Sequence, residues 1–343
     1  EAVAGYQQAV ELAGPSPRTE ADRKAAHASH HALARLLKTR LGDPLRARDN
    51  LEAALIIDPS DRIAMDELLP YFRASDRSAD LAAACEKAAA ITEDPIRRAA
   101  LWAEAGEVYR GRLNQVDRAE KLLTQAIDLD GHNRIALTGL LSLAEGRRDG
   151  AKLCRCLKAL ADLTIDPQER CRLYRRLAVA ARDLTFDLDL SATAYREVLN
   201  LEPDDLPALG ELAAIDRRRN DVSGLAWALE NRARVAEAQG DRRLAAGSLR
   251  ELAQIYDLRL GRSAEALAVL ERSVDLFHDE ATQNDLATLA LRVDRPSLAR
   301  RALESILARS TGTESAEKTA ELRARLGRAC ELLGDTAAAI DHY

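Results

Sequence analysis

Apolar residues along this chain recur with the period of an α-helix rather than the alternation of a β-strand. In the stretch AEKLLTQAIDL, Ala119, Leu122, Leu123, Ala126 and Ile127 fall at positions i, i+3, i+4, i+7 and i+8, which is one face of a helix. No β-branched, alternating run of strand length occurs. The pattern predicts an all-α chain of about nineteen helices with no sheet.

The helical pattern also repeats itself. Similar long stretches begin 72 residues apart at Leu33, Ala105 and Leu177, and further copies begin at Leu252 and, incompletely, at Leu326. A second, weaker unit begins halfway through each period, at Leu68, Leu140, Leu212 and Leu286. Each period therefore holds two units of roughly 36 residues, and each unit is predicted to contain two helices.

Proline and glycine mark the predicted boundaries of these helices. We expect Gly14-Pro15 to end the first helix, and we expect extra residues to lie in turns at Ala238–Asp241 and Ser310–Ser315. Four acidic-proline pairs are predicted to place a proline in the first turn of a helix, where its missing N–H costs little: Asp58-Pro59, Asp94-Pro95, Asp166-Pro167 and Glu202-Pro203.

The units resemble tetratricopeptide repeats (TPRs), in which small and large residues occupy fixed places of a helix-turn-helix. The stretch LGRACELLGDTAAAIDHY is similar to the family in Leu326-Gly327, the LGD turn, Ala339 and Tyr343. Tyr109 and Tyr256 stand where the family has an aromatic residue, and Ala119 and Ala266 stand where its two helices touch. Asp58-Pro59 and Glu202-Pro203 match its closing proline.

The chain also departs from the family pattern in two ways. The units from Leu33, Ala105, Leu177 and Leu252 carry one extra residue in the turn. In the half-period units, a bulkier leucine replaces the contact alanine, which would widen the helix packing, at Leu81, Leu153, Leu225 and Leu298. The resemblance implies a right-handed α-solenoid over residues 1–343, treated as a single segment.

Both ends of the chain read as cuts made inside a longer protein. The sequence starts without Met, and it stops inside a repeat unit at Tyr343. A unit needs a neighbour to bury its apolar face, so we expect self-association through the exposed ends.

Composition narrows the function classes. Charged residues make up 31% of the chain and the formal net charge is −6, so nucleic acid is a disfavoured partner. No run of about 18 apolar residues predicts a membrane span. The five cysteines are sparse and odd in number, which favours reduced thiols in the cytoplasm and leaves a periplasmic location open. The excess of arginine over lysine is typical of a GC-rich, bacterial genome.

Three stretches are candidates for chemistry, and each has a simpler interpretation. Cys154 and Cys156 point in different directions on a helix and are interpreted, with Cys171, as buried small side chains. His27 and His31 are spaced like a metal-binding pair, but no third ligand lies near them in sequence. The glycine stretch at 146–152 lacks the spacing of a phosphate loop.

Trp102 and Trp227 are interpreted as packing residues, and DLDL at 187–190 as a helix cap. We therefore predict no catalytic, cofactor-binding or metal-binding residues, no cofactor, and no enzyme activity.

The resemblance implies that the first helix of each unit lines a concave groove. Groove positions carried over from the family hold twelve basic and seven acidic residues, although the chain is acidic overall. A groove with charge of one sign steers a partner of opposite charge. The arginines predicted to bind the partner are Arg110, Arg172, Arg175, Arg182, Arg217, Arg218 and Arg250.

The sequence thus predicts a non-enzymatic scaffold that binds a protein or peptide, possibly acidic, along a partly basic groove. An alternative stays open: the segment could be the regulatory sensor arm of a larger enzyme or signalling protein whose catalytic domain lies outside it.

Overall fold

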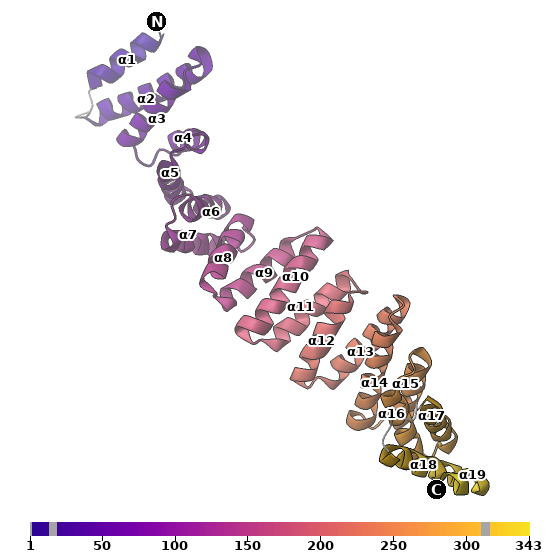
Figure 1. Ribbon diagram of the computed structural model, residues 1–343. Coiled ribbons are helices and arrows are strands. Elements are labelled where there is room, and N and C mark those ends of the chain that lie inside the picture. The colour runs from indigo at the N-terminus through magenta and orange to yellow at the C-terminus, as the bar shows by residue number, and fades with distance from the viewer. Residues whose placement is uncertain (1, 14–18, 310–315) are drawn as a thin grey trace. The chain divides into compact units, whose positions relative to one another are not determined.

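The computed structural model describes residues 2–13, 19–309 and 316–343, and these contain nineteen α-helices and no strand, which confirms the all-α prediction (Figure 1). Three short π-helical segments, η1 to η3, follow α2, α10 and α14 directly. The bounds are α1 Ala2–Ala13, α2 Glu20–Leu36, η1 Leu37–Leu41, α3 Pro44–Ile57, α4 Arg62–Ala74, α5 Ser78–Ile91, α6 Pro95–Gly111, α7 Val116–Leu129, α8 Arg134–Arg147, α9 Gly150–Leu163, α10 Pro167–Ala180, η2 Ala181–Thr185, α11 Leu188–Leu201, α12 Leu206–Arg219, α13 Val222–Ala238, α14 Arg242–Gln254, η3 Ile255–Arg259, α15 Ser263–Leu276, α16 Glu280–Arg292, α17 Pro296–Arg309, α18 Ala316–Leu332 and α19 Thr336–His342.

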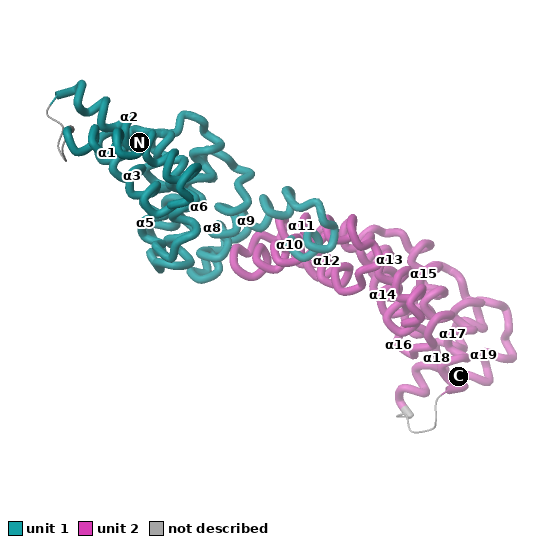
Figure 2. Tube along the Cα trace, turned by 90° about the horizontal axis from the view of Figure 1, so that it is seen from above, with its two compact units in different colours: residues 1–173 teal, residues 174–343 magenta. Residues whose placement is uncertain are grey.

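The helices pair into the predicted units. Each even-numbered helix from α2 to α18 opens a unit and is called its first helix; the odd-numbered helix that follows is its second helix. The chain divides into two compact units, residues 1–173 and 174–343, with the boundary inside α10 (Figure 2). Within each of them, helices consecutive in the chain pack on one another.

Side-chain caps explain why so many helices start where they do. At each capped start, an Asp, Asn or Thr oxygen accepts a hydrogen bond from a backbone N–H of the first turn, which satisfies a group that would otherwise lack a partner. The caps are Thr19, Asp43, Asp61, Asp94, Asn133, Asp149, Asp187, Asp205, Asp221, Asp241, Asp279 and Asp335. The predicted cap in DLDL is Asp187, which accepts from Leu190 N.

The extra residue in alternate units has a clear structural form. In four of the five units without the extra residue, the first helix closes with a backbone hydrogen bond from residue i to i−5, as from Asp149 N to Ala144 O (2.9 Å). In the four units with the extra residue, the closing bond reaches i−6: Asp43 to Leu37, Gln115 to Tyr109, Asp187 to Ala181 and Arg262 to Tyr256. The added residue therefore widens the last turn of the first helix, and three of these four turns are π-helical.

The proline prediction was right for two of the four pairs. Pro95 and Pro167 begin α6 and α10. Pro59 and Pro203 instead lie in the turn before the helix, where the N–H of Asp61 bonds to Asp58 O and that of Asp205 to Glu202 O. In those units, the acidic residue two positions after the proline caps the helix, and α12 carries a different proline, Pro207, in its first turn. Gly14-Pro15 and Ser310–Ser315 lie outside the described residues, while Gln239 and Gly240 form the predicted turn directly after α13.

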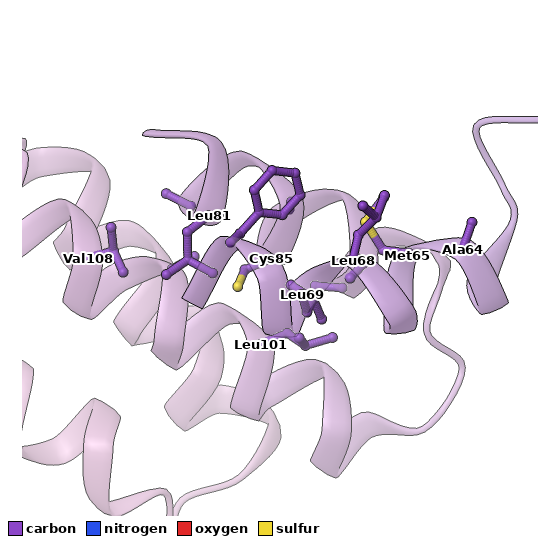
Figure 3. Packing of buried hydrophobic residues seen from close by; sticks show 14 of the residues in the cluster. Ala64, Met65, Leu68, Leu69, Leu81, Cys85, Leu101 and Val108 are labelled. Atoms are coloured by element: carbon purple, nitrogen blue, oxygen red, sulfur yellow. The ribbon is translucent and has the colours of Figure 1, made fainter. Parts of the chain in front are cut away.

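The core runs between the layers of helices. In the stretch from α4 to α6, Leu68, Leu69, Leu81, Cys85 and Leu101 pack together (Figure 3). Each fully buried leucine contributes roughly 1.5–3 kcal/mol. Burial raises the pKa of the Cys85 thiol to about 12, so this cysteine is a neutral packing residue.

Among the described residues, no helix combines the length and the apolar character needed to cross a membrane.

Candidate partner-binding face of the first helices

All seven arginines predicted to bind a partner lie on first helices or their π-helical ends. Arg110 is in α6, Arg172 and Arg175 are in α10, and Arg182 is in η2. Arg217 and Arg218 close α12, and Arg250 lies in α14. The helical register used in the sequence analysis therefore placed these residues on the intended elements.

Six of the seven arginines are paired with carboxylates, which sequence reasoning missed. Arg250 Nε lies 2.6 Å from Asp285 Oδ2, Arg175 Nη2 lies 2.6 Å from Asp205 Oδ2, and Arg172 contacts Glu169 at 3.3 Å. Further pairs join Arg110 to Glu107, Arg182 to Asp183 and Glu211, and Arg217 to Glu251. The expected surplus of free positive charge is thus largely neutralised.

The exception is Arg218, which has no ion pair within the described residues. It lies near Asp183, whose pKa is held below its ordinary value by the Arg182 guanidinium and, more weakly, by Arg218.

The sequence did not reveal these counter-ions because several of them lie on the first helix of the next repeat unit, about 30 residues later in the chain. Arg217 on α12 meets Glu251 on α14, and Arg250 on α14 meets Asp285 on α16. Residues 1–173 show the same arrangement, since Arg73 on α4 makes a two-pronged contact to Glu104 on α6, with both N–O distances 2.6 Å. We call this series of contacts between successive first helices the charge ladder.

Hollows lie beside the charge ladder at two equivalent places. In residues 1–173, a hollow of about 580 Å³ is walled by α4 and α6. Its apolar lining is Leu81 of the intervening second helix, Ala100 and Val108. In residues 174–343, a hollow of about 390 Å³ is walled by α14, η3 and α16. Its apolar lining includes Leu270 of the intervening α15 and Leu289. Arg73 and Glu104 edge the first hollow, and Asp257 and Arg292 edge the second. Each hollow therefore combines an apolar lining with an ion-paired rim.

The paired histidines have a neighbour that their sequence context did not show. His27 and His31, on one face of α2, both direct Nε2 at Oδ2 of Asp61, the residue that caps α4. Sequence reasoning had discounted this pair because no third ligand lay nearby, but the fold brings one in from 30 residues away. The only available signal was the position of Asp61 as a helix cap.

The remaining candidates behave mostly as predicted. Cys154, Cys156 and Cys171 are buried, and the stretch 146–152 spans the end of α8, a turn at Arg148 and the cap Asp149 that starts α9. Trp102 packs against the core, as predicted. Trp227 does not: it is 47% exposed on α13, because its position faces away from both neighbouring helices.

No model of a known protein family matches the sequence, and no curated protein does either. Among solved structures, YrrB, described as a TPR protein with an unusual peptide-binding site, is 16% identical, with a TM-score of 0.37 over 61% of this chain and 98% of that one. The TPR domain of P58(IPK) is 16% identical, with a TM-score of 0.28 over 90% and 99% of the two chains. MamA is 17% identical, with a TM-score of 0.36 over 50% and 87%.

These identities and scores are low, so the nature of the repeat is judged from the chain itself. Ala119 and Ala266 are fully buried between the paired helices, as the TPR pattern implies. A Cβ built on Gly327 would lie 2.9 Å from the ring of Tyr343, so glycine lets α18 approach α19 closely. The described residues form a TPR-like helical repeat array. Its units depart from the family mainly in the widened turns.

Proposed function

We propose that this chain is a protein-interaction scaffold that binds a peptide or protein segment along its first helices. The observation that carries the proposal is the pair of equivalent hollows, each walled by successive first helices and lined by a leucine from the second helix between them. An apolar side chain of a partner would fill such a hollow, while the polar rim would hold its backbone and charged groups.

The proposed partner segment is acidic and extended, and it contacts the seven arginines named above. Because six of these are already paired, an incoming carboxylate exchanges one ion pair for another. Exposed pairs of this kind are worth about 0–1 kcal/mol each. Most of the affinity therefore comes from apolar groups in the hollows, and the arginines set the register of the segment.

The location of the binding face is tested by photo-crosslinking in a lysate of the source organism. A photoreactive amino acid is placed at Ala100 or Gln254, which are exposed and line the two hollows. The matched control positions are Lys121 and Ala268, which are exposed on the second helices α7 and α15. We expect the same partner to be captured from Ala100 and Gln254 and not from the controls. Equal capture from all four positions, or capture from the second helices alone, contradicts the proposal.

The role of charge is tested on the captured partner with a charge exchange. Arg250→Glu combined with Asp285→Arg keeps the ion pair between α14 and α16 but reverses its direction. The control exchange, Arg272→Glu with Glu237→Arg, does the same between second helices α15 and α13. We expect the first exchange to weaken binding several-fold and the control to leave it unchanged, and we expect added salt to weaken binding moderately. If neither the charge exchange nor added salt changes the affinity, an acidic partner is ruled out.

A further inference from the structure

Three side chains from two separate segments of residues 1–173 converge on one point. His27 and His31 are four residues apart on α2, and their rings lie 4.8 Å apart, centroid to centroid, at 66°. Both Nε2 atoms face a single oxygen, Asp61 Oδ2, which is 2.8 Å from His27 Nε2 and also hydrogen-bonds to His31 Nε2. The three potential ligand atoms lie within 4.8 Å of one another, and this is the one such group of His, Cys or acidic residues in the described part of the chain.

The carboxylate of this group is held in place independently of the histidines. Asp61 Oδ1 accepts hydrogen bonds from the backbone N–H groups of Ile63, at 3.0 Å, and Ala64, at 3.1 Å, as the cap of α4. This leaves Oδ2 directed at the imidazoles. Ligand carboxylates in metal sites are typically fixed by such outer hydrogen bonds, which orient them before the ion arrives.

The surroundings favour a cation. The side chain of Asp61 is only 6% exposed, and its two oxygens face the N–H groups of the α4 cap on one side and the two imidazoles on the other. Asp58, in the turn before Asp61, adds a second carboxylate, whose Oδ1 accepts hydrogen bonds from Ser60 N at 2.9 Å and Ser60 Oγ at 2.6 Å. The two imidazoles are each about one quarter exposed, so the point where the three side chains meet is open to solvent on one side.

We propose that His27, His31 and Asp61 bind a divalent transition-metal ion, with Zn²⁺ as the ion that fits the ligands best. Two imidazole nitrogens and one carboxylate oxygen are a donor set that Zn²⁺ accepts, with bonds of about 2.0–2.2 Å and the fourth tetrahedral position left to water. Ligand atoms on such an ion stand roughly 3.3 Å apart. The present arrangement needs only small side-chain adjustments to reach that spacing.

The ion would join two successive units. Its ligands lie on α2 and on the capping residue of α4, which are separated in the chain by all of α3 and the turn at Asp58–Ser60. Binding therefore stabilises the packing of the repeat unit α2–α3 against the repeat unit that begins with α4. Because the ion binds the folded chain, the melting temperature rises with ion concentration.

The alternative is a hydrogen-bonded cluster that needs no metal, in which both imidazoles donate to Asp61. Variants can separate the two interpretations. His27→Gln and His31→Gln keep an N–H donor for Asp61 but remove a good metal ligand. Asp61→Asn keeps the helix cap, since asparagine is as good a cap as aspartate, but removes the carboxylate. His30→Gln is the control, because His30 lies beside the pair and bonds to Asn50 instead.

The experiment titrates the reduced, full chain with CoCl₂ and ZnCl₂, using visible absorption for Co²⁺, calorimetry for Zn²⁺ and thermal unfolding for both. We expect one ion per chain in the micromolar range, four-coordinate Co²⁺ absorption without thiolate bands, and a higher melting temperature. Each of the three ligand substitutions should weaken binding at least about tenfold, whereas His30→Gln should leave it unchanged. Thiolate bands would place the ion on a cysteine and overturn the proposal. So would the absence of stoichiometric binding, or equal binding by all variants.

Discussion

At the scale of the residue, left-handed backbone recurs at one position of the four units with the widened turn. Gly42, Asn114 and Gly261 adopt it with φ of 63°, 53° and 66°, and all three are residues that tolerate it well. In the unit from Leu177, the same place is taken by Phe186, with φ of 56°. A bulky side chain there is strained, and the ring of Phe186 recovers little by burial because the residue is 74% exposed.

We expect Phe186→Gly to raise the free energy of unfolding by about 1 kcal/mol, because glycine removes the cost of the left-handed conformation. Chemical denaturation of the two proteins measures the difference. Leu184→Gly is the control: it lies two residues earlier in the same π-helical turn, has ordinary backbone angles and should lower stability. A loss of stability in Phe186→Gly would show that contacts of the ring outweigh the strain.

A second residue of interest is the buried carboxylate Asp216 on α12. It is fully buried and accepts a hydrogen bond from Arg219 at 2.8 Å, while Arg196 lies 3.4 Å from both Asp216 and Asp221. Burial raises the pKa of Asp216, the nearby Asp221 adds to the rise, and the two arginines oppose it. The folded chain therefore binds this proton more tightly than the unfolded chain.

The pH dependence of stability follows from the direction of this pKa shift. A raised pKa in the folded state adds stability below the unfolded value, and this contribution is lost as the pH rises through the folded value. Wild type should therefore gain stability relative to Asp216→Asn as the pH falls from neutral towards the ordinary carboxyl pKa of 3.8. Denaturant unfolding of both proteins at several pH values gives this difference. A constant or decreasing difference would mean that the two arginines dominate over burial.

At the scale of the element, glycines set how closely α6, α7 and α8 pack. Leu123 of α7 is fully buried between two of them. A Cβ built on Gly106 of α6 would lie 2.7 Å from Leu123 Cγ, and one on Gly139 of α8 would lie 2.8 Å from Leu123 Cδ1. The leucine occupies the space that side chains on both neighbouring helices would need.

Gly106→Ala should therefore destabilise the protein by about 1–3 kcal/mol, as expected for overpacking of a core. Gly146→Ala is a matched control near the end of α8, where an added Cβ meets nothing within 4 Å. In a helix, that exchange should instead stabilise by about 0.5–1 kcal/mol. Thermal unfolding of both variants measures the contrast, and a smaller cost of Gly106→Ala in the Leu123→Ala background than in the wild type would identify the clash as its cause. Equal effects of the two alanines would contradict this explanation.

The widened turns are also a property of elements. The sequence showed the extra residue in four units but not what it does. The structure shows that it moves the acceptor of the closing backbone hydrogen bond from residue i−5 to residue i−6, and that in two of the four units the donor residue, Asp43 or Asp187, also caps the next helix. An insertion is tolerated there because the backbone groups still find partners within the turn.

At the scale of the whole molecule, a repeat array is held by contacts between neighbours, so damage should stay local. Leu68 of α4 and Leu249 of α14 are both buried, but they belong to different compact units. Each change to alanine should cost about 2–5 kcal/mol by leaving a cavity.

Hydrogen exchange measured by mass spectrometry tests the locality of these changes. Leu68→Ala should speed exchange in α4, α5 and α6 and leave α14 to α17 unchanged, and Leu249→Ala should do the reverse. Faster exchange throughout the chain in either variant would indicate that the two units unfold as one cooperative body.

The sequence alone determined the helices, their pairing and the repeat, because these depend on local spacing: the apolar period, the caps and the places of Ala119, Ala266 and Gly327. It also placed all seven arginines on first helices. The tertiary structure decided what those residues meet, since Glu251, Asp285 and Glu104 lie about 30 residues away from their arginine partners and come close only when successive units stack. Asp61 joins His27 and His31 for the same reason. Local periodicity fixes which face a side chain occupies, whereas its partners across the face depend on how each unit packs on the next.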